Sequence, residues 1–198
     1  MIAFFAFVQF FPATVLHAAR PEAEKTGDVI YKFSDHLAES ETVMRYEIEE
    51  GNRKETSGEW KGDSFYFAGP IAKKIEVKPM PFIIDAISRK AIHVKFPGKS
   101  SIQCRFFNVV PGSEMNIYYG PEPTTAEKTS RSSDYLNFRI WAGRHELKHL
   151  RIKVEEGWTY EKIDLGIIPF LNREVPITFE IASETEGLGF NFVATIRN

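Results

Sequence analysis

The sequence has a single cysteine, Cys104, in 198 residues, so no disulfide bond can form within the chain. No cysteine follows the apolar stretch near the N-terminus either, where a lipid-anchored protein would need one. Cys104 alternates with Ile102 and Phe106, which places its thiol on the same face of a predicted strand as two apolar side chains. We interpret Cys104 as a small core residue, because a reactive thiol needs an exposed and electropositive setting.

The chain also lacks an excess of charge of either sign. Its 25 lysines and arginines and 27 acidic residues give a net charge of -2, and no basic block stands out along the sequence. A protein that binds nucleic acid through its phosphates needs a concentrated positive field, so nucleic-acid binding is not expected. Internal repeats and long amphipathic helical patterns are missing as well, which argues against repeat and helical-bundle folds.

What the sequence has in abundance is aromatic residues, 17 of them phenylalanine, and short alternating runs. Apolar side chains occupy every second position of these runs, as a half-buried strand requires, and turn-forming residues separate them about every ten residues. The clearest runs are Leu136–Ile140, Leu150–Val154, Ile163–Leu165, Val175–Ile181 and Phe190–Ile196. The pattern predicts an all-β fold, a two-sheet antiparallel β-sandwich with little helix, with Phe138, Phe179 and Phe192 in its core.

The N-terminal segment predicts export. Residues 2–16 are almost wholly apolar, and Ala18 and Ala19 follow just before the polar stretch that begins at Arg20. An apolar run of this length is shorter than the roughly 20 residues of a membrane-spanning helix, and small residues are typical of a signal-peptide cleavage site. The usual positively charged start is missing, so a buried first strand or helix is the alternative. We expect a signal peptide over residues 1–19, no stable membrane span in the mature chain, and a secreted or periplasmic protein.

The rest of the chain suits one domain, because its apolar content of 43% is sufficient for a core of its own. We therefore expect a single β-sandwich domain over residues 20–198. The alternating runs between residues 28 and 90 would supply additional strands, either as an extra sheet layer or as a small separate subdomain.

Several segments of the last part of the chain follow a recognisable order, namely Ile92–Pro97, Met115–Gly120, Asn137–Ile140, Leu150–Val154, Trp158, Ile163–Leu165, Val175–Glu180 and Phe190–Phe192. This order resembles the galactose-binding-domain-like jelly roll, which occurs in carbohydrate-binding modules and in uncharacterised secreted bacterial proteins. The resemblance implies a jelly-roll core over about residues 90–198 and a role in glycan binding. The large apolar area of Trp158 separately predicts that its side chain packs in the core. It also permits a structural calcium ion, for which no residues of this chain identify the ligands.

The segment His145-Glu146-Leu147-Lys148-His149 matches the zinc-protease pattern HExxH. In a zinc enzyme, His145 and His149 lie one helical turn apart and bind the metal, and Glu146 is the general base. Gly143 precedes the segment and alternating runs flank it, so the local pattern predicts a solvated hairpin and not a helix. A zinc-dependent metallohydrolase stays an alternative, as does a non-catalytic metal site at the two histidines.

The strongest candidate for ligand binding is the face of the strand around residue 139 that points away from the core. Asn137, Arg139 and Trp141 share that face, and Arg151 and Lys153 of the next strand are expected beside them. A planar aromatic ring beside hydrogen-bonding groups suits a sugar, whose CH groups stack on the ring while its hydroxyls bond to the polar side chains. An ordinary solvated face with one exposed tryptophan is the alternative.

Tyr118 and Tyr119 are further candidates, because they end a predicted strand beside the polar loop of residues 120–134. Alternation turns one of them inward, so at most one is available to a ligand. We therefore expect a non-catalytic module that recognises carbohydrate or another cell-envelope component. The alternatives are a structural or assembly protein of the cell surface, which would use its sheet edges and phenylalanine-rich faces, and the zinc hydrolase.

Overall fold

The computed structural model describes residues 27–49, 52–68, 75–84, 86–122, 135–154, 157–166 and 173–198. The predicted signal peptide, residues 1–19, lies outside the described residues. The described part has two single-turn 3-10 helices, η1 (Phe33–Asp35) and η2 (Leu37–Glu39), and no helix in it is long and apolar enough to cross a membrane. Its strands are β1 (Val29–Lys32), β2 (Glu41–Glu49), β3 (Asn52–Lys61), β4 (Ser64–Phe67), β5 (Glu76–Ile84), β6 (Ile87–Lys95), β7 (Ser100–Val109), β8 (Glu114–Pro121), β9 (Tyr135–Ala142), β10 (His145–Lys153), β11 (Thr159–Asp164), β12 (Val175–Ser183) and β13 (Gly189–Arg197).

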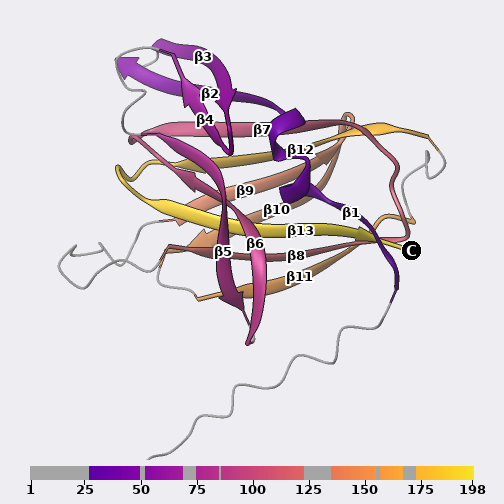
Figure 1. The fold of residues 1–198 in the computed structure, drawn as a ribbon. Coiled ribbons are helices and arrows are strands. Elements are labelled where there is room, and N and C mark those ends of the chain that lie inside the picture. The colour runs from indigo at the N-terminus through magenta and orange to yellow at the C-terminus, as the bar shows by residue number, and fades with distance from the viewer. Residues whose placement is uncertain are drawn as a thin grey trace, which may run out of the picture.

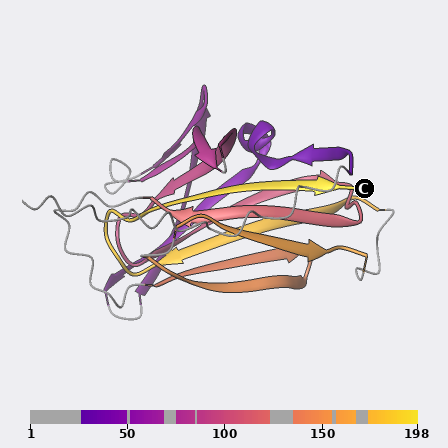
Figure 2. The same cartoon turned by 90° about the horizontal axis from the view of Figure 1, so that it is seen from below.

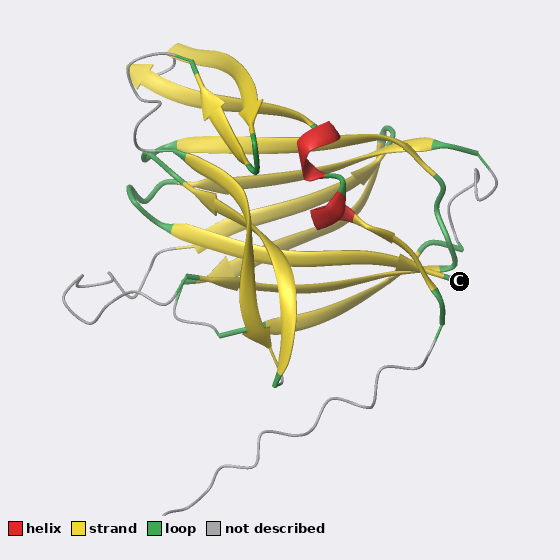
Figure 3. Ribbon diagram, viewed as in Figure 1, coloured by secondary structure: helices red, strands yellow, loops and turns green. Residues whose placement is uncertain are grey.

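The strands form two antiparallel layers (Figure 1), which lie one above the other when seen from below (Figure 2). Sheet I has the order β10-β9-β12-β7-β2-β3, and sheet II has the order β4-β5-β6-β13-β8-β11, with β1 paired to the end of β13. Strand β3 belongs to both layers, because residues 52–57 pair with β2 and residues 58–61 pair with β4. Strands dominate the ribbon and the helical turns are confined to one place (Figure 3). The predicted all-β, two-sheet antiparallel sandwich with little helix is confirmed.

Alternation of apolar and polar residues builds each layer. On β9, Leu136, Phe138 and Ile140 are buried, and the residues between them are exposed or half-buried. Strands β7 and β12 of the same sheet show the same period of two. Because successive side chains of a strand point to opposite faces, β7, β9 and β12 each turn one apolar row towards sheet II and one more polar row towards solvent.

Phenylalanine rings from both sheets meet in the core. The ring centroid of Phe138 on β9 lies 5.2 Å from those of Phe190 and Phe192 on β13, and 6.1 Å from that of Phe179 on β12. Phe33 of η1 adds an edge-to-face contact with Phe179 at 4.8 Å. Phe138, Phe179 and Phe192 are fully buried, which confirms the core predicted for them.

The β5–β6 hairpin leaves sheet II and crosses its outer face (Figure 1). Strand β6 pairs with β13 only over residues 92–95, whereas its pairing with β5 continues to Ile87. Trp158 packs under this hairpin, with its ring centroid 5.5 Å from that of Phe82, and not in the main core as expected. A second, smaller apolar cluster lies between the hairpin and sheet II. It consists of Ile84, Ala91, Tyr118 and Val193, with Phe82 and Trp158 packed against it.

The side chain of Cys104 is fully buried on β7, as predicted. Burial raises the pKa of the Cys104 thiol to about 12, although the hydroxyl of Thr42 donates a hydrogen bond to Sγ at 3.9 Å, which lowers it. We predict that iodoacetamide at pH 8 alkylates the native protein at least about a hundredfold more slowly than the urea-unfolded chain, because only a thiolate reacts. The chain has no other cysteine, so mass spectrometry reports this site alone. Equal rates in both states would show that β7 opens to solvent.

Candidate ligand-binding face

The HExxH segment is part of a β-hairpin. Strands β9 and β10 are joined by a tight turn in which Gly143 has a φ of +59°, and β10 begins at His145. The predicted hairpin is therefore confirmed, and the helix that a zinc-protease site requires is not formed. Four residues of extended strand separate His145 from His149 by about 13 Å. The described part of the chain also has no group of three or more His, Cys, Asp or Glu that could hold a metal ion.

The hairpin sets the predicted polar residues side by side. Asn137 is the cross-strand partner of Arg151, and Arg139 is the partner of His149. A hydrogen bond of 3.3 Å joins His149 Nε2 and Asn137 Oδ1. A bulge after Glu146 shifts the register, and Trp141 lies opposite this carboxylate. These side chains point away from the core, so sheet I carries on its outer face the polar row that alternation predicts.

The same face continues across the neighbouring strands. Ala182 of β12 lies between Asn137 and Ser101 of β7, and Ser101 is the partner of Arg45 on β2. We call the solvent side of β10, β9, β12, β7 and β2 the binding face. The small side chains of Ser101 and Ala182 form its middle, with longer polar side chains on both sides.

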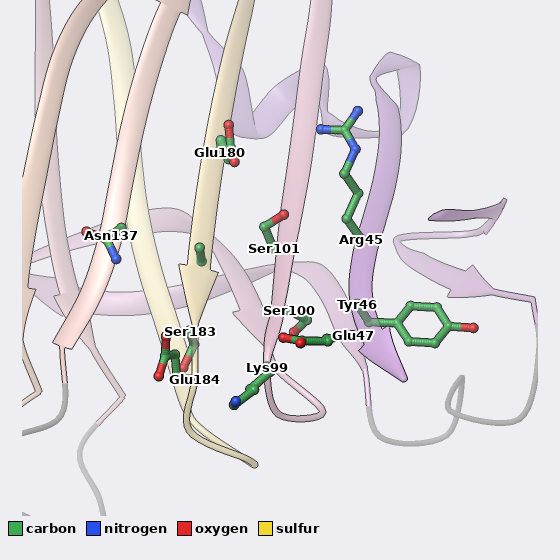
Figure 4. Close-up of a pocket in the computed structure, with 11 residues that line it drawn as sticks. Arg45, Tyr46, Glu47, Lys99, Ser100, Ser101, Asn137, Glu180, Ser183 and Glu184 are labelled. Carbon is green, nitrogen blue, oxygen red and sulfur yellow. The ribbon is translucent and has the colours of Figure 1, made fainter. Parts of the chain in front are cut away.

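A shallow depression of about 310 Å³ lies on the binding face. Figure 4 shows Glu180 and Asn137 on one side of it and Arg45 on the other, with Ser101 between them. Arg45 Nε donates a hydrogen bond to Glu55 at 2.8 Å, and Gln103 Nε2 donates one to Glu180 at 3.1 Å. The depression is lined by Arg45, Tyr46, Glu47, Lys99, Ser100, Ser101, Asn137, Glu180, Ala182, Ser183 and Glu184.

Of these lining residues, only Asn137 was predicted from the sequence. Arg45, Ser101 and Ala182 were missed because pairing of β2 and β7 brings together residues that lie far apart in the chain. The alternating runs indicate that these side chains point away from the core, but alternation does not show which strands are neighbours in the sheet.

Aromatic rings border the polar surface. Trp141 is half-buried at one end of β9. Tyr135, 38% exposed at the other end, carries the guanidinium of Arg151 over its ring at 4.1 Å from the centroid. Phe107 on β7 is 46% exposed, with Arg105 at 5.0 Å from its ring centroid. The face thus combines flat apolar surfaces with donors and acceptors, the two features that a sugar ring requires.

The predicted candidates Tyr118 and Tyr119 lie elsewhere, on β8 of sheet II. Both are buried, at 7% and 5% exposure, so the expectation that one of them could reach a ligand needs correction. Tyr119 points into the core, and Tyr118 lies beneath the β5–β6 hairpin with the guanidinium of Arg89 at 4.1 Å from its ring centroid. The β5–β6 hairpin covers Tyr118, whereas the alternating pattern of β8 alone would place this side chain in solvent.

No protein family and no curated protein matches the sequence. Similar solved structures include one of carbohydrate-binding modules from the β-sandwich superfamily, with 13% identity, a TM-score of 0.46 and coverage of 85% of this chain and 61% of that chain. The module CBM27-1 of Caldicellulosiruptor saccharolyticus, in complex with mannohexaose, is 11% identical over 72% of this chain and 89% of that chain, with a TM-score of 0.46.

A cyclase from Fischerella is also similar, with 10% identity, a TM-score of 0.37 and coverage of 66% of this chain and 79% of that chain. This chain spans only 61% of the length of the first structure named above, that of carbohydrate-binding modules from the β-sandwich superfamily. Two of the similar structures are described as carbohydrate-binding modules. Because one fold hosts many functions, the function must be argued from the residues of the binding face.

Proposed function

We propose that this chain is a non-catalytic carbohydrate-binding module that binds glycan on the outer face of sheet I. The observation that carries the proposal is the depression over Ser101 and Ala182, which lies beside Asn137 and within a face bordered by Trp141. Small side chains leave room for a ring, and the surrounding amide, carboxylate and guanidinium groups offer bonds to hydroxyls. Rigid strands hold these groups, so little ordering is needed when a ligand binds.

The polar groups suit hydroxyl recognition because hydrogen-bond donors and acceptors lie next to each other on the face. Glu180 accepts a hydrogen bond from Gln103 and keeps further acceptor capacity, while Asn137 has both a donor and an acceptor group. A sugar hydroxyl donates one bond and accepts others, so it fits between such groups. Export of the protein, proposed from its apolar N-terminal segment, would bring this face to extracellular or cell-envelope polysaccharide.

The alternative of a structural or assembly protein finds less support in the described residues. Its partners would contact phenylalanine-rich faces and open sheet edges. Most phenylalanines of the described part point into the core, with Phe107 the one that is largely exposed. Strand β5 pairs with β4 at a single position, and its open edge carries Pro79 and Pro81, which lack the N–H needed to add another strand.

We predict that Trp141→Ala weakens glycan binding about tenfold, because it removes the flat surface on which a sugar ring stacks. Ala182→Leu, which fills the middle of the depression without changing charge, is expected to have a similar effect. A glycan array identifies the ligand, and isothermal titration calorimetry then measures its affinity for each variant. The matched control is Tyr66→Ala, because Tyr66 is 54% exposed on β4 of sheet II, away from the face.

The three variants separate the proposal from its alternatives. Loss of affinity in Trp141→Ala and Ala182→Leu, with unchanged affinity in Tyr66→Ala, supports binding on sheet I. Equal affinity in all of them places any glycan site elsewhere. If the wild-type protein binds no glycan on the array, the proposed function is wrong.

A further inference from the structure

The cations of the binding face differ in whether a carboxylate neutralises them. Arg45 pairs with Glu55 at 2.8 Å, and Arg105 lies 3.9 Å from Glu41. Arg151 and Arg139, in contrast, form no ion pair with any residue that the structure describes. Two guanidinium groups therefore keep their donors available on the same part of the sheet.

These two arginines belong to one block of four side chains. Asn137 and Arg139 follow each other on the outer side of β9, and their partners on β10 are Arg151 and His149. Directly paired residues of an antiparallel ladder have Cβ atoms about 5 Å apart, and diagonal neighbours about 7 to 8 Å apart. Long arginine side chains at such positions can both reach one anionic group.

The guanidinium of Arg151 is already oriented. It lies over the ring of Tyr135 at 4.1 Å from the centroid, so the aromatic ring holds the guanidinium on the outer side of β9 and β10 without using its N–H donors in an ion pair. On the other side of the block, Glu180 is the cross-strand neighbour of Arg139, but this carboxylate accepts a hydrogen bond from Gln103 at 3.1 Å. A planar carboxylate matches the geometry of such arginine donors, and a carboxylate is the anionic group of uronic acids.

We infer that the glycan is acidic and that the carboxylate of a uronic acid residue binds Arg139 and Arg151, while a neighbouring ring stacks on Trp141. This inference rests on the proposed function and names its ligand class. Tyr135 is a positioning residue in this arrangement, because it contacts Arg151 and not the sugar. The middle of the face, where the side chains of Ser101 and Ala182 are small, leaves room for the sugar, and the polar side chains around it bind the hydroxyl groups.

The test compares acidic polymers with esters that share their sugar backbone. Polygalacturonate, alginate and hyaluronate are each titrated against their methyl esters, which keep the sugar backbone and lose the carboxylate charge. The wild-type protein is expected to bind at least one acid about tenfold more tightly than its ester, with an affinity that falls as salt is added. Arg151→Gln and Arg139→Gln should each bring the acid close to the affinity of the ester.

Lys61→Gln is the control, since it removes one positive charge at a residue that pairs with Glu59 at 2.7 Å on the part of β3 that belongs to sheet II, away from the binding face. This variant should keep the preference for the acid. Arg151→Lys should keep part of it, because an ammonium preserves the charge and loses the two-pronged geometry.

Three results would overturn the inference of an acidic ligand, and they differ in whether they also refute the proposed carbohydrate-binding function. Equal binding of acid and ester, or binding of neutral glycans alone, with dependence on Trp141, refutes the acidic ligand and leaves the carbohydrate-binding function standing. Binding of no glycan at all refutes both. Binding of dextran sulfate and uronate polymers alike, unaffected by Trp141→Ala, shows a general attraction between charges and likewise refutes both.

Discussion

Replacing Gly58 with alanine is expected to destabilise the fold by about 3 kcal/mol or more, because the added methyl group has no room. A Cβ on Gly58 would overlap the carbonyl oxygen of Tyr66 and lie 2.8 Å from the Cα of Phe67. Both atoms belong to the backbone of β4, so no change of side-chain rotamer relieves the contact. In the Gly58→Ala protein, strands β3 and β4 must move apart at the position where Gly58 pairs with Phe67.

The position of Gly58 explains why this separation is costly. Residues of β3 before it pair with β2 in sheet I, and residues from Gly58 onwards pair with β4 in sheet II. The glycine thus marks the point where one strand passes between the layers, and close backbone approach at such a corner is a common reason for glycine in a strand. A shift there disturbs both sheets at once.

Urea unfolding followed by fluorescence measures this effect as a lower midpoint at an unchanged slope. Gly157→Ala is the control, because a Cβ at Gly157 would meet nothing within 4 Å and the backbone there requires no glycine. It should change the free energy of unfolding by less than about 0.5 kcal/mol. A Gly58→Ala protein as stable as this control would mean that β3 and β4 are not paired as described.

Much of the fold was predictable because its signal is local. The alternating runs of Leu136–Ile140, Val175–Ile181 and Phe190–Ile196 each define which side chains enter the core, and β9, β12 and β13 follow them. The same local signal correctly predicted a strand at the HExxH segment, because the alternating residues around it are typical of extended chain. The five-residue match to the zinc-protease pattern would have required a helix. For these strands, the sequence alone was sufficient to predict the secondary structure and the buried side chains.

The candidate site was predictable only in part, because it depends on which strands are neighbours. Asn137 and Arg151 were expected side by side, as hairpin partners separated by a short turn. The partnership of Ser101 with Arg45 and Ala182 joins residues distant in the chain, and nothing in an alternating run specifies it. For the same reason the sequence did not reveal that the β5–β6 hairpin buries Tyr118.

Phe138→Ala is expected to reduce the free energy of unfolding by about 3 to 5 kcal/mol, the range for a large aromatic side chain removed from a packed core. Phe138 is fully buried and touches rings of both sheets, with centroids 5.2 Å from Phe190 and Phe192 and 6.1 Å from Phe179 and from Tyr119. Its removal leaves a cavity where the two layers meet. Since small domains have about 5 to 15 kcal/mol in total, the loss is a large fraction of the stability.

The matched control is Phe107→Ala, because Phe107 lies on β7 of the same sheet but is 46% exposed. It loses its contact with Arg105 and should cost less than about 1 kcal/mol in urea unfolding. Phe138→Leu, which keeps much of the apolar volume, should fall between the two. Phe138 also lies between Asn137 and Arg139 on β9, so the packing of its ring fixes the strand that carries the proposed carboxylate site. If Phe138→Ala and Phe107→Ala cost the same, the two sheets are not held together by this aromatic core.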